Sequence, residues 1–549
     1  MKRSLAVAFL LALLLLLGPG TTSFAQEPDE DWRMMRVYFQ NQAELNALAN
    51  RIDIWEVNRE GGYVLTRAPA RVGRTLLQQG LHVSMGQGMV HRQYLGLQLA
   101  HPRTWHGISG YPCYRTVEET YDTFARLAER YPKLARWQDV GDSWEKVTPG
   151  GPEGYDLMAM VLTNQDVPGP KPKLFIIAAI HAREYVTAEL ATRFAEHLLA
   201  NYGVDADITW LLDHYECHIM PQVNPDGRKK AETGELWRKN TDDDDGCTLP
   251  GSVGVDLNRN SSFKWNHGGA SSAACSEIYL GPEAASEPEV QAIQHYARSI
   301  FADHRGPGDS DAAPDDTPGV FITLHSYSQL VLFPWIWTDT QPAPNARQLQ
   351  TLGRKFGYFN RYTVCSDCLY SASGTTDDFV YGDLGVASYT FELGTQFFQS
   401  CNFFEQDIIP KNMPALLYAF KAARQPYLDA LGPDVLDVTL SAPAVAAGTP
   451  ITLTASADDT RYASGQQGEE PVQVLAAARY TLDAPSWENA PAHIMRARDG
   501  AFDATTEIIT AQIDTTGLTP GRHTLFIEAQ DADGNWGVPT AIFLTIIEP

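Results

Sequence analysis

Residues 173–184 read Lys-Leu-Phe-Ile-Ile-Ala-Ala-Ile-His-Ala-Arg-Glu. The apolar run at residues 174–180 does not alternate with polar residues, which is typical of a strand covered on both faces. His181 follows this predicted strand directly, and we expect a helix to begin after it. In α/β sheets, ligand sites gather at the carboxyl ends of the strands. The stretch therefore predicts an α/β fold with a polar site at one edge of its central sheet.

His181 and Glu184 are candidate metal ligands, because a His and a Glu three residues apart on one helical turn can face the same cation. A lone pair of this kind arises often by chance, so a third ligand is required. His325 also follows an apolar run directly, at residues 320–324. Two imidazoles and one carboxylate leave the fourth position of a tetrahedral zinc ion open, which is the catalytic arrangement. For His325 taken alone, the alternative is a hydrogen-bonded core histidine.

Glu392 follows a third apolar run, at residues 388–391. An acidic side chain at the end of a buried strand requires a partner or a function that explains its burial. Near a metal ion it can accept a proton from water and act as a general base. The alternative is a buried glutamate paired with an arginine. The apolar runs alternate with predicted helices from about residue 111 to residue 430, which indicates one α/β block.

The chain resembles the zinc metallocarboxypeptidase family of pancreatic carboxypeptidases A and B, and especially its secreted bacterial relatives of the carboxypeptidase T type. The resemblance covers residues 111–430 and implies a mixed central sheet flanked by helices. The motifs occur in the family order: His181-x-x-Glu184, Asn224-Pro225-Asp226-Gly227, Leu236-Trp237-Arg238-Lys239, Asp256-Leu257-Asn258-Arg259-Asn260, His325-Ser326-Tyr327, Tyr370-Ser371-Ala372-Ser373-Gly374 and Thr390-Phe391-Glu392-Leu393.

The resemblance implies a role for each matching position. One zinc ion would be bound by His181, Glu184 and His325. Catalysis would be carried by Glu392, as general base and then proton donor, and by Arg238, which would stabilise the oxyanion. The substrate would be bound by Asn258, Arg259 and Tyr370, which would hold its terminal carboxylate, and by Tyr327 and Arg183.

The proposed carboxylate-binding residues have a physical reason of their own. An enzyme that removes the last residue of a chain must recognise the free carboxylate there. The guanidinium of Arg259 can grip a carboxylate through two parallel charge-assisted hydrogen bonds. A continuing chain would leave that guanidinium unpaired in a closed pocket, at a cost of about 1–3 kcal/mol. For Arg259 without its motif, a structural salt bridge is the alternative.

Asp377 is the candidate determinant of side-chain preference. Counted without gaps from Tyr370 to Glu392, it occupies the position at which family members place the base of the side-chain pocket. An aspartate in a partly dry pocket attracts Lys and Arg side chains. We therefore expect basic or dual basic and apolar preference. The alternative is that Asp377 or, more suitably, Asp378 caps the following helix.

The N-terminus indicates the compartment. Lys2 and Arg3 precede an apolar run at residues 5–17, and small residues at positions 23 and 25 suit a cleavage site. This pattern predicts a secretory signal peptide at residues 1–25. The alternative is a membrane anchor, but the run is shorter than the roughly 20 residues that span a bilayer. We expect a secreted, monomeric protein with no membrane contact after signal removal.

The charge of the chain limits its partners. The 549 residues include 42 Lys and Arg against 67 Asp and Glu, a net charge of −25. Such an acidic molecule repels phosphate backbones, which argues against nucleic acid as a partner. Peptides or proteins with a free C-terminus are the partners that the family resemblance implies.

Two further blocks flank the α/β block at residues 107–430. Residues 34–90 have the pattern of a small β-α-β-β-α-β sandwich, and we predict that residues 26–106 are a propeptide with its linker. Residues 432–549 contain short strands separated by Gly, Pro and Asp turns, which predicts an immunoglobulin-like β-sandwich.

The cysteines and one acidic run complete the predictions. By the family resemblance, Cys247 and Cys275 form a disulfide. Cys113 with Cys401 is a candidate second bridge, and for Cys365 and Cys368 a local bond or none is favoured over a redox or metal role. The acidic residues 242–245 could contribute to a Ca²⁺ site, but a solvated loop is the favoured interpretation.

Two other functions remain open at the level of sequence. The same zinc chemistry could act on a cell-wall peptide, which the carboxylate-binding set does not exclude. A non-catalytic secreted binding protein could also be built on a peptidase scaffold, although such proteins usually lose a ligand or the base, and none is missing here.

Overall fold

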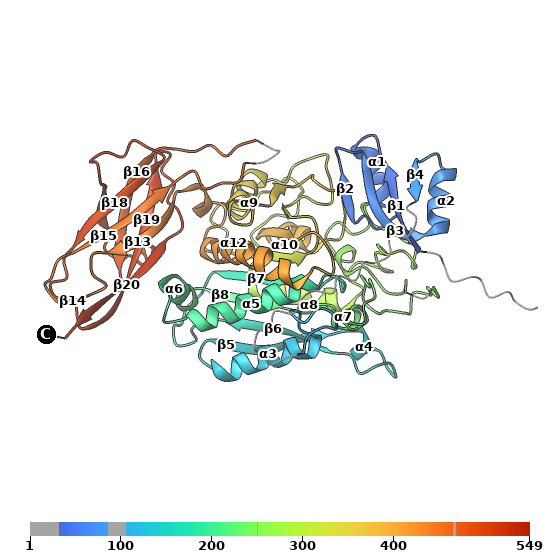
Figure 1. Cartoon of the computed structure of the whole chain (residues 1–549), viewed down its shortest axis with the longest axis horizontal. Coiled ribbons are helices and arrows are strands. Elements are labelled where there is room, and N and C mark those ends of the chain that lie inside the picture. The colour runs from blue at the N-terminus through green and yellow to red at the C-terminus, as the bar shows by residue number, and fades with distance from the viewer. Residues whose placement is uncertain (1–31, 86–105, 250, 465–467, 549) are drawn as a thin grey trace, which may run out of the picture.

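The structure is a computed structural model that describes residues 32–85, 106–249, 251–464 and 468–548. The predicted signal peptide and most of the predicted linker lie outside the described residues. Figure 1 shows a central α/β part with a small sheet at one end and a β-rich part at the other. Among the described residues, no helix combines the length and the apolar character that a membrane span requires.

The small N-terminal sheet has the predicted β-α-β-β-α-β order of elements. Its four strands lie in the order β2-β3-β1-β4, and all strand pairs are antiparallel. Apolar residues of the sheet and of α1, among them Val37, Leu45 and Val64, form its own core. The elements are β1 (Trp32–Tyr38), α1 (Gln42–Ala49), β2 (Glu56–Asn58), β3 (Tyr63–Pro69), α2 (Ala70–Gln78) and β4 (Val83–Met85).

The central part is a mixed eight-stranded sheet, which confirms the predicted fold class. The strand order is β11-β10-β12-β9-β7-β8-β6-β5. The four middle strands β12, β9, β7 and β8 are parallel, and the antiparallel pairs lie toward the edges. The strands are β5 (Ala135–Asp142), β6 (Asp156–Leu162), β7 (Lys173–Ile177), β8 (Glu216–Met220), β9 (Val320–His325), β10 (Leu330–Leu332), β11 (Thr363–Cys365) and β12 (Ala387–Glu392).

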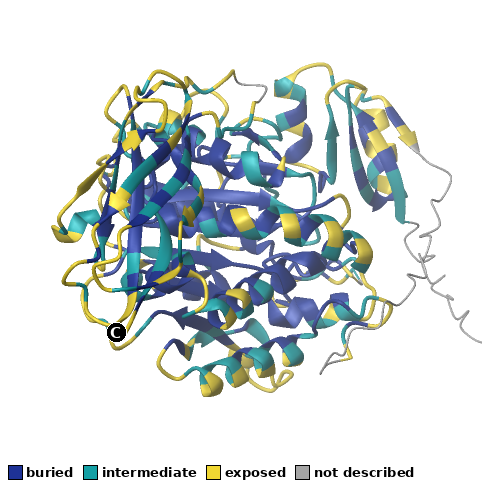
Figure 2. Ribbon diagram, turned by 60° about the vertical axis from the view of Figure 1, so that its left-hand side comes forward, coloured by how far each residue is buried: buried dark blue, intermediate teal, exposed yellow. Residues whose placement is uncertain are grey.

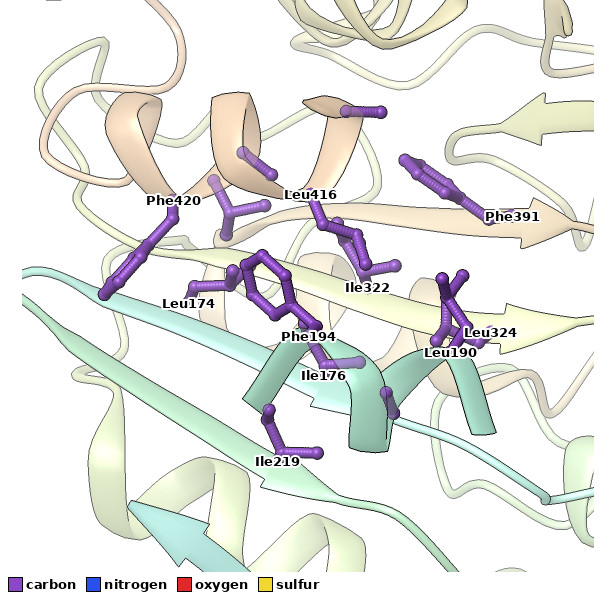
Figure 3. Close-up of a cluster of buried hydrophobic side chains, with 14 of the residues drawn as sticks. Leu174, Ile176, Leu190, Phe194, Ile219, Ile322, Leu324, Phe391, Leu416 and Phe420 are labelled. Atoms are coloured by element: carbon purple, nitrogen blue, oxygen red, sulfur yellow. The ribbon is translucent and has the colours of Figure 1, made fainter. Parts of the chain in front are cut away.

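Helices cover both faces of this sheet, so alternate residues of β7 enter different cores. Leu174 and Ile176 pack with α5 and α12, whereas Phe175 and Ile177 pack with α8 and α10. Figure 3 shows the first of these cores, and in Figure 2 the buried residues concentrate around the sheet. The helices are α3 (Val117–Arg130), α4 (Trp144–Val147), α5 (Tyr185–Asn201), α6 (Ala206–His214), α7 (Pro225–Glu232), α8 (Pro288–Ile300), α9 (Ala346–Asn360), α10 (Thr376–Leu384), α11 (Cys401–Phe403) and α12 (Ile409–Ala422).

The structure corrects two details of the predicted metal-binding segment. β7 ends at Ile177, so His181 does not follow the strand directly. Ala179 has φ +56°, a conformation that cannot continue a strand, and its N–H donates to the Thr187 hydroxyl. α5 begins at Tyr185, so His181 and Glu184 lie on a turn before the helix and not on one helical turn.

The C-terminal part is a β-rich region consistent with the predicted β-sandwich. β17 pairs with both β18 and β16 and joins the strands into one eight-stranded order. Two short strands, β14 and β17, were not predicted. The strands are β13 (Asp434–Leu440), β14 (Ala444–Ala446), β15 (Ile451–Asp458), β16 (Leu475–Leu482), β17 (His493–Ala497), β18 (Thr506–Ile513), β19 (Gly521–Asp531) and β20 (Thr540–Ile547).

Polar and aromatic contacts join this part to the central part. Asp207 on α6 accepts a hydrogen bond from the Ala541 N–H at 2.8 Å, and Lys421 on α12 donates one to the Thr540 hydroxyl at 3.3 Å. Trp210 of the same helix packs against Trp487 and Phe526. The interface lies at the end of the molecule away from the small N-terminal sheet (Figure 1).

Six of the seven cysteines form disulfides, as Cys113–Cys401, Cys247–Cys275 and Cys365–Cys368. The first closes a chain segment of 288 residues and the second brackets the segment that carries Asn258 and Arg259. Cys217 on β8 is a buried free thiol.

Candidate metal centre

Parallel neighbouring strands bring the distant candidate residues to one edge of the central sheet. β9 and β12 pair in parallel, with Glu392 in register with His325 at the ends of the two strands. β7 is the other neighbour of β9, and the chain that leaves it carries His181. Because the carboxyl ends of parallel strands meet at the same edge, residues far apart in sequence share one site.

His181, Glu184 and His325 bring their metal-binding atoms together. Nδ1 of His181 lies 2.8 Å from Oε1 of Glu184 and 3.2 Å from Nδ1 of His325. Nδ1 of His325 lies 3.3 Å from Oε2 of Glu184. All three residues are buried, and their ligand atoms lie within 4.8 Å of one another. Two imidazole nitrogens and a carboxylate are a donor set that zinc takes in catalytic sites.

Asp256 fixes His181 in the form that a metal ion requires. Oδ1 of Asp256 lies 3.1 Å from Nε2 of His181, so the Nε2 proton is donated to this carboxylate and the Nδ1 lone pair faces Glu184 and His325. The residues present therefore fit a zinc ion. Sequence reasoning gave Asp256 no role, although its place two residues before Asn258 in the same motif was an available signal.

The same Asp256 carboxylate holds Arg238 beside the metal-binding atoms. Nε and Nη2 of Arg238 lie 3.0 and 2.8 Å from Oδ2 of Asp256, and Nη1 lies 3.4 Å from Nδ1 of His181. The guanidinium is buried against the site. It can therefore stabilise a negative oxygen that develops next to the metal.

The two glutamates of the site have different proton affinities. Burial raises the pKa of Glu392 to about 7, with a further contribution from Glu184. Burial acts in the same sense on Glu184, but His181 and His325 outweigh it and lower the pKa of that carboxyl. Glu184 is thus an ionised ligand, whereas Glu392 can exchange a proton near neutral pH.

One cavity joins all the residues predicted for metal binding, catalysis and substrate binding. Its walls come from the central sheet, the loops at the sheet edge and the N-terminal part. The predicted residues that line it are His181, Arg183, Glu184, Arg238, Asn258, Arg259, His325, Tyr327, Tyr370, Asp377 and Glu392.

Backbone carbonyls position the predicted carboxylate-binding arginine. Nε of Arg259 donates to the Gly269 carbonyl at 2.8 Å, and Nη1 donates to the Asn258 carbonyl at 2.7 Å. Gly374 packs directly against this residue: it has φ +71°, and a Cβ there would lie 2.2 Å from the Arg259 carbonyl oxygen. A glycine is therefore required where the Tyr370 motif meets the Arg259 turn.

Asp377 faces the cavity from the first turn of α10. Its Oδ2 accepts a hydrogen bond from the Thr390 hydroxyl at 2.9 Å, and its Oδ1 accepts one from the Asp378 N–H at 3.0 Å. The suggestion that Asp378 caps the helix is wrong, because Thr375 is the N-cap residue. Asp378 instead accepts hydrogen bonds from the N–H groups of Ile336 and Trp337 and so ties α10 to the opposite cavity wall.

The N-terminal part contacts two arginines of the cavity through Asp53, which sequence reasoning missed. Oδ2 of Asp53 lies 2.6 Å from Nη2 of Arg183, and Oδ1 lies 3.7 Å from Nη1 of Arg238. Asp53 is buried, and its neighbours Ile54 and Trp55 line the cavity. The partners are 130 residues apart, and no local pattern in the sequence marks this pair.

The calcium prediction gains no support. Among the described residues, two groups could hold a metal ion by their composition and spacing: His181 with Glu184 and His325, and Asp499 with Asp503 and Glu507. The acidic run at residues 242–245 does not form such a group.

The family model for zinc carboxypeptidases matches residues 120–413. The chain belongs to the zinc carboxypeptidase family. The matched residues contain the metal-binding set and every predicted site residue of the cavity.

Individual carboxypeptidases are similar over about half of the chain. Carboxypeptidase A2 of Rattus norvegicus is 33% identical over 296 residues, which are 52% of this chain and 64% of that protein. The match thus spans less than two thirds of this relative. Carboxypeptidase B of Astacus astacus is 33% identical over 290 residues, which are 51% of this chain and 86% of that protein.

Two solved structures share the fold. The structure of thrombin activatable fibrinolysis inhibitor matches with a TM-score of 0.54 and 25% identity, over 71% of this chain and 98% of that one. Carboxypeptidase A from Helicoverpa armigera matches with a TM-score of 0.57 and 22% identity, over 72% of this chain and 99% of that one.

Replacing Asp256 with Asn tests the orienting role of this carboxylate in the zinc carboxypeptidase site. The variant keeps the shape of the side chain but loses its charge, so it holds His181 and Arg238 less firmly. We expect zinc affinity to fall by about 10–100-fold, measured by competition with a chelator. Asp243→Asn, which removes an exposed charge nearby, is the control and should leave the affinity unchanged. Equal zinc affinity in the two variants would contradict the role.

Proposed function

We propose that this chain is a secreted zinc metallocarboxypeptidase that hydrolyses the C-terminal peptide bond of peptides and proteins, with basic or dual basic and apolar preference. One observation carries the proposal: a metal-binding triad, a candidate base and a buried arginine suited to a carboxylate line the same cavity. The family to which the chain belongs supports the reaction class.

The proposed roles follow from the positions of the side chains. His181, Glu184 and His325 would hold zinc, which when bound supplies Lewis-acid polarisation of a carbonyl and acidifies water. Glu392 has a pKa near the value that suits a general base at neutral pH. It would accept a proton from the attacking water and later donate it to the leaving amine.

The remaining residues would bind and orient the substrate. Arg238, held by Asp256, would stabilise the oxyanion. Arg259 would grip the terminal carboxylate, with Asn258 and Tyr370 on the same cavity wall. The free chain end would thus be fixed at a set distance from Glu392, so that only the last peptide bond reaches the base.

Replacing Glu392 with Gln tests the reaction. We expect kcat to fall by about 10²–10⁴-fold or more, because the amide cannot accept the proton, while zinc content stays at one ion per chain. The assay compares a peptide that has a free C-terminus with the same peptide carrying a C-terminal amide. Hydrolysis of the free form alone supports the proposal, and turnover retained in Glu392→Gln would refute the role of this residue. Both chains are assayed after the linker is cut, because the N-terminal part is proposed below to cover the cavity. Absence of hydrolysis in the cut, otherwise unaltered chain would favour a binding protein instead.

Asp377 supports a preference for basic C-terminal residues. It lies at the cavity wall with one hydrogen bond to each carboxylate oxygen, so it retains acceptor capacity for an ammonium or guanidinium group. Leu332, Ile336 and Ala372 line the same cavity, and their apolar surface is the basis for dual preference.

Replacing Asp377 with Asn tests this preference. We expect kcat/KM for a peptide ending in Arg to fall by about thirtyfold, the equivalent of the roughly 2 kcal/mol that loss of a buried charge partner costs. The same peptide ending in Phe is the control, and its kcat/KM should change little. An unchanged ratio of the two substrates would show that Asp377 does not select basic side chains.

We also propose that the N-terminal part is a propeptide that covers the cavity until the linker is cut. The support is the contact of Asp53 with Arg183 and Arg238, two residues that line the cavity. Burial opposes ionisation of Asp53, but the two arginines outweigh it and lower its pKa from the ordinary value of an aspartate. The contact is therefore present at neutral pH and is lost only as the pH falls through that lowered pKa.

Replacing Asp53 with Ala in the full, uncut chain tests whether this contact keeps the N-terminal part over the cavity. The change removes the carboxylate that lies 2.6 Å from Arg183 and, of the described residues, leaves only Glu277, at 3.9 Å, as its acidic partner. Breaking a buried ion pair costs about 3–5 kcal/mol. We therefore expect the activity of the uncut chain on a small substrate to rise at least about tenfold. Glu60→Ala, an exposed acid of the same N-terminal part, is the matched control. Equal activities of the two uncut variants would rule out this contact as the restraint.

A further inference from the structure

A short disulfide lies at the base of the loop that carries Tyr370. Cys365 is the last residue of β11, is fully buried, and is in register with Leu332 of β10. Its partner Cys368 is three residues further along the chain. The bridge therefore connects β11, the outermost strand of the central sheet, directly to the loop at residues 366–371. We call this segment the Tyr370 loop.

The Tyr370 loop forms one wall of the cavity. Ser366, Leu369 and Tyr370 line the cavity together with Glu392 and Asp377. Beyond the loop the chain is fixed again, because the Ala372 N–H donates to the Ile336 carbonyl at 2.9 Å. Without the bridge, six residues would connect the two fixed points, Cys365 and Ala372. With the bridge, only the three residues 369–371 do so.

The N-terminal part supplies a second set of restraints on the same loop. Nη2 of Arg59 donates to the carbonyls of Asp367 at 2.8 Å and Leu369 at 3.2 Å, and its Nε donates to the Cys368 carbonyl at 3.3 Å. At the far end of the loop, the Ser371 N–H donates to Oδ1 of Asn46 at 3.1 Å. These hydrogen bonds are lost if the N-terminal part leaves, whereas the bridge stays.

We propose that the Cys365–Cys368 disulfide is a positioning element that keeps Tyr370 and the cavity wall in place once the N-terminal part no longer holds the loop. Shortening a free segment reduces the entropy that is lost when its residues are ordered around a substrate. The bridge and the contacts from the N-terminal part restrain the same short segment, so each masks the loss of the other. The inference rests on the proposed function, since Tyr370 is assigned to the substrate there.

Hydrogen exchange of the full chain tests whether the bridge and Arg59 each hide the loss of the other, without any assay of activity. Three variants are compared with the unaltered chain: C365S/C368S, R59A and the combination of all three changes. We expect amide exchange at residues 366–372 to be moderately faster in C365S/C368S and in R59A than in the unaltered chain. In the combination, the exchange rate should rise by more than the product of the two separate factors. C113S/C401S, which removes the bridge between Cys113 and Cys401 and changes no residue of the loop, is the control and should leave this segment unchanged. Exchange in the combined variant equal to that of R59A would overturn the proposal.

Steady-state kinetics distinguish positioning from general stability. After the linker of the full chain is cut with trypsin, we expect C365S/C368S to raise KM for a free-carboxylate peptide about threefold, the factor for doubling a loop from three to six residues. kcat should be unchanged, and C113S/C401S should leave KM unchanged. A fall in kcat at unchanged KM, or the same KM change in both variants, would overturn the proposal.

Two further comparisons separate a failure of the variant to fold, and a failure of the proposed function, from a failure of the positioning role. If C365S/C368S does not fold, wild-type and R59A chains with this bridge reduced and alkylated replace it in the exchange experiment, with the same expected order. If the cut, unaltered chain does not hydrolyse the peptide, the proposed function fails, while the exchange experiment still decides whether the bridge holds the loop.

Discussion

The buried carboxylate of Asp256 is the interaction on which the site depends. One of its oxygens accepts the Nε2 proton of His181, and the other holds the guanidinium of Arg238. A single acid thereby fixes both the lone pair that faces the metal position and the cation beside it. Its own burial is compensated because an imidazole N–H and a guanidinium together satisfy its charge and its acceptors. Any displacement of Asp256 would disturb metal binding and oxyanion stabilisation at once.

The order of strands in the central sheet places the other site residues around His181 and Arg238. β12, β9 and β7 are neighbours, so Glu392, His325 and the turn with His181 meet at one sheet edge. The small N-terminal sheet then reaches the same edge twice, with Asp53 against Arg183 and with Arg59 against the Tyr370 loop. The same surface thus binds the N-terminal part and, in the proposed function, the substrate.

The sequence predicted much of this arrangement because its two signals, apolar runs and short motifs, are local. Uninterrupted apolar runs identified β7, β9 and β12, and every side chain predicted to line the site does line one cavity. The errors arise from a contact outside the run. Nothing in the run at residues 173–180 shows that the strand ends at Ile177, because Ala179 has a left-handed conformation and its N–H donates to the Thr187 hydroxyl of the following helix. The helix expected after His181 begins only at Tyr185.

The fold class, the zinc carboxypeptidase family and the chemical identity of the site residues could be predicted from the residues alone, since these are encoded in short motifs and hydrophobic periodicity. The partner that each buried charge takes became known from the folded chain. Asp256 pairs with His181 and Arg238, Asp53 crosses from the N-terminal part to Arg183, and the bridge at Cys365 closes the Tyr370 loop. Such pairings depend on the distance between atoms in the folded chain, and the spacing of residues along the sequence does not set that distance.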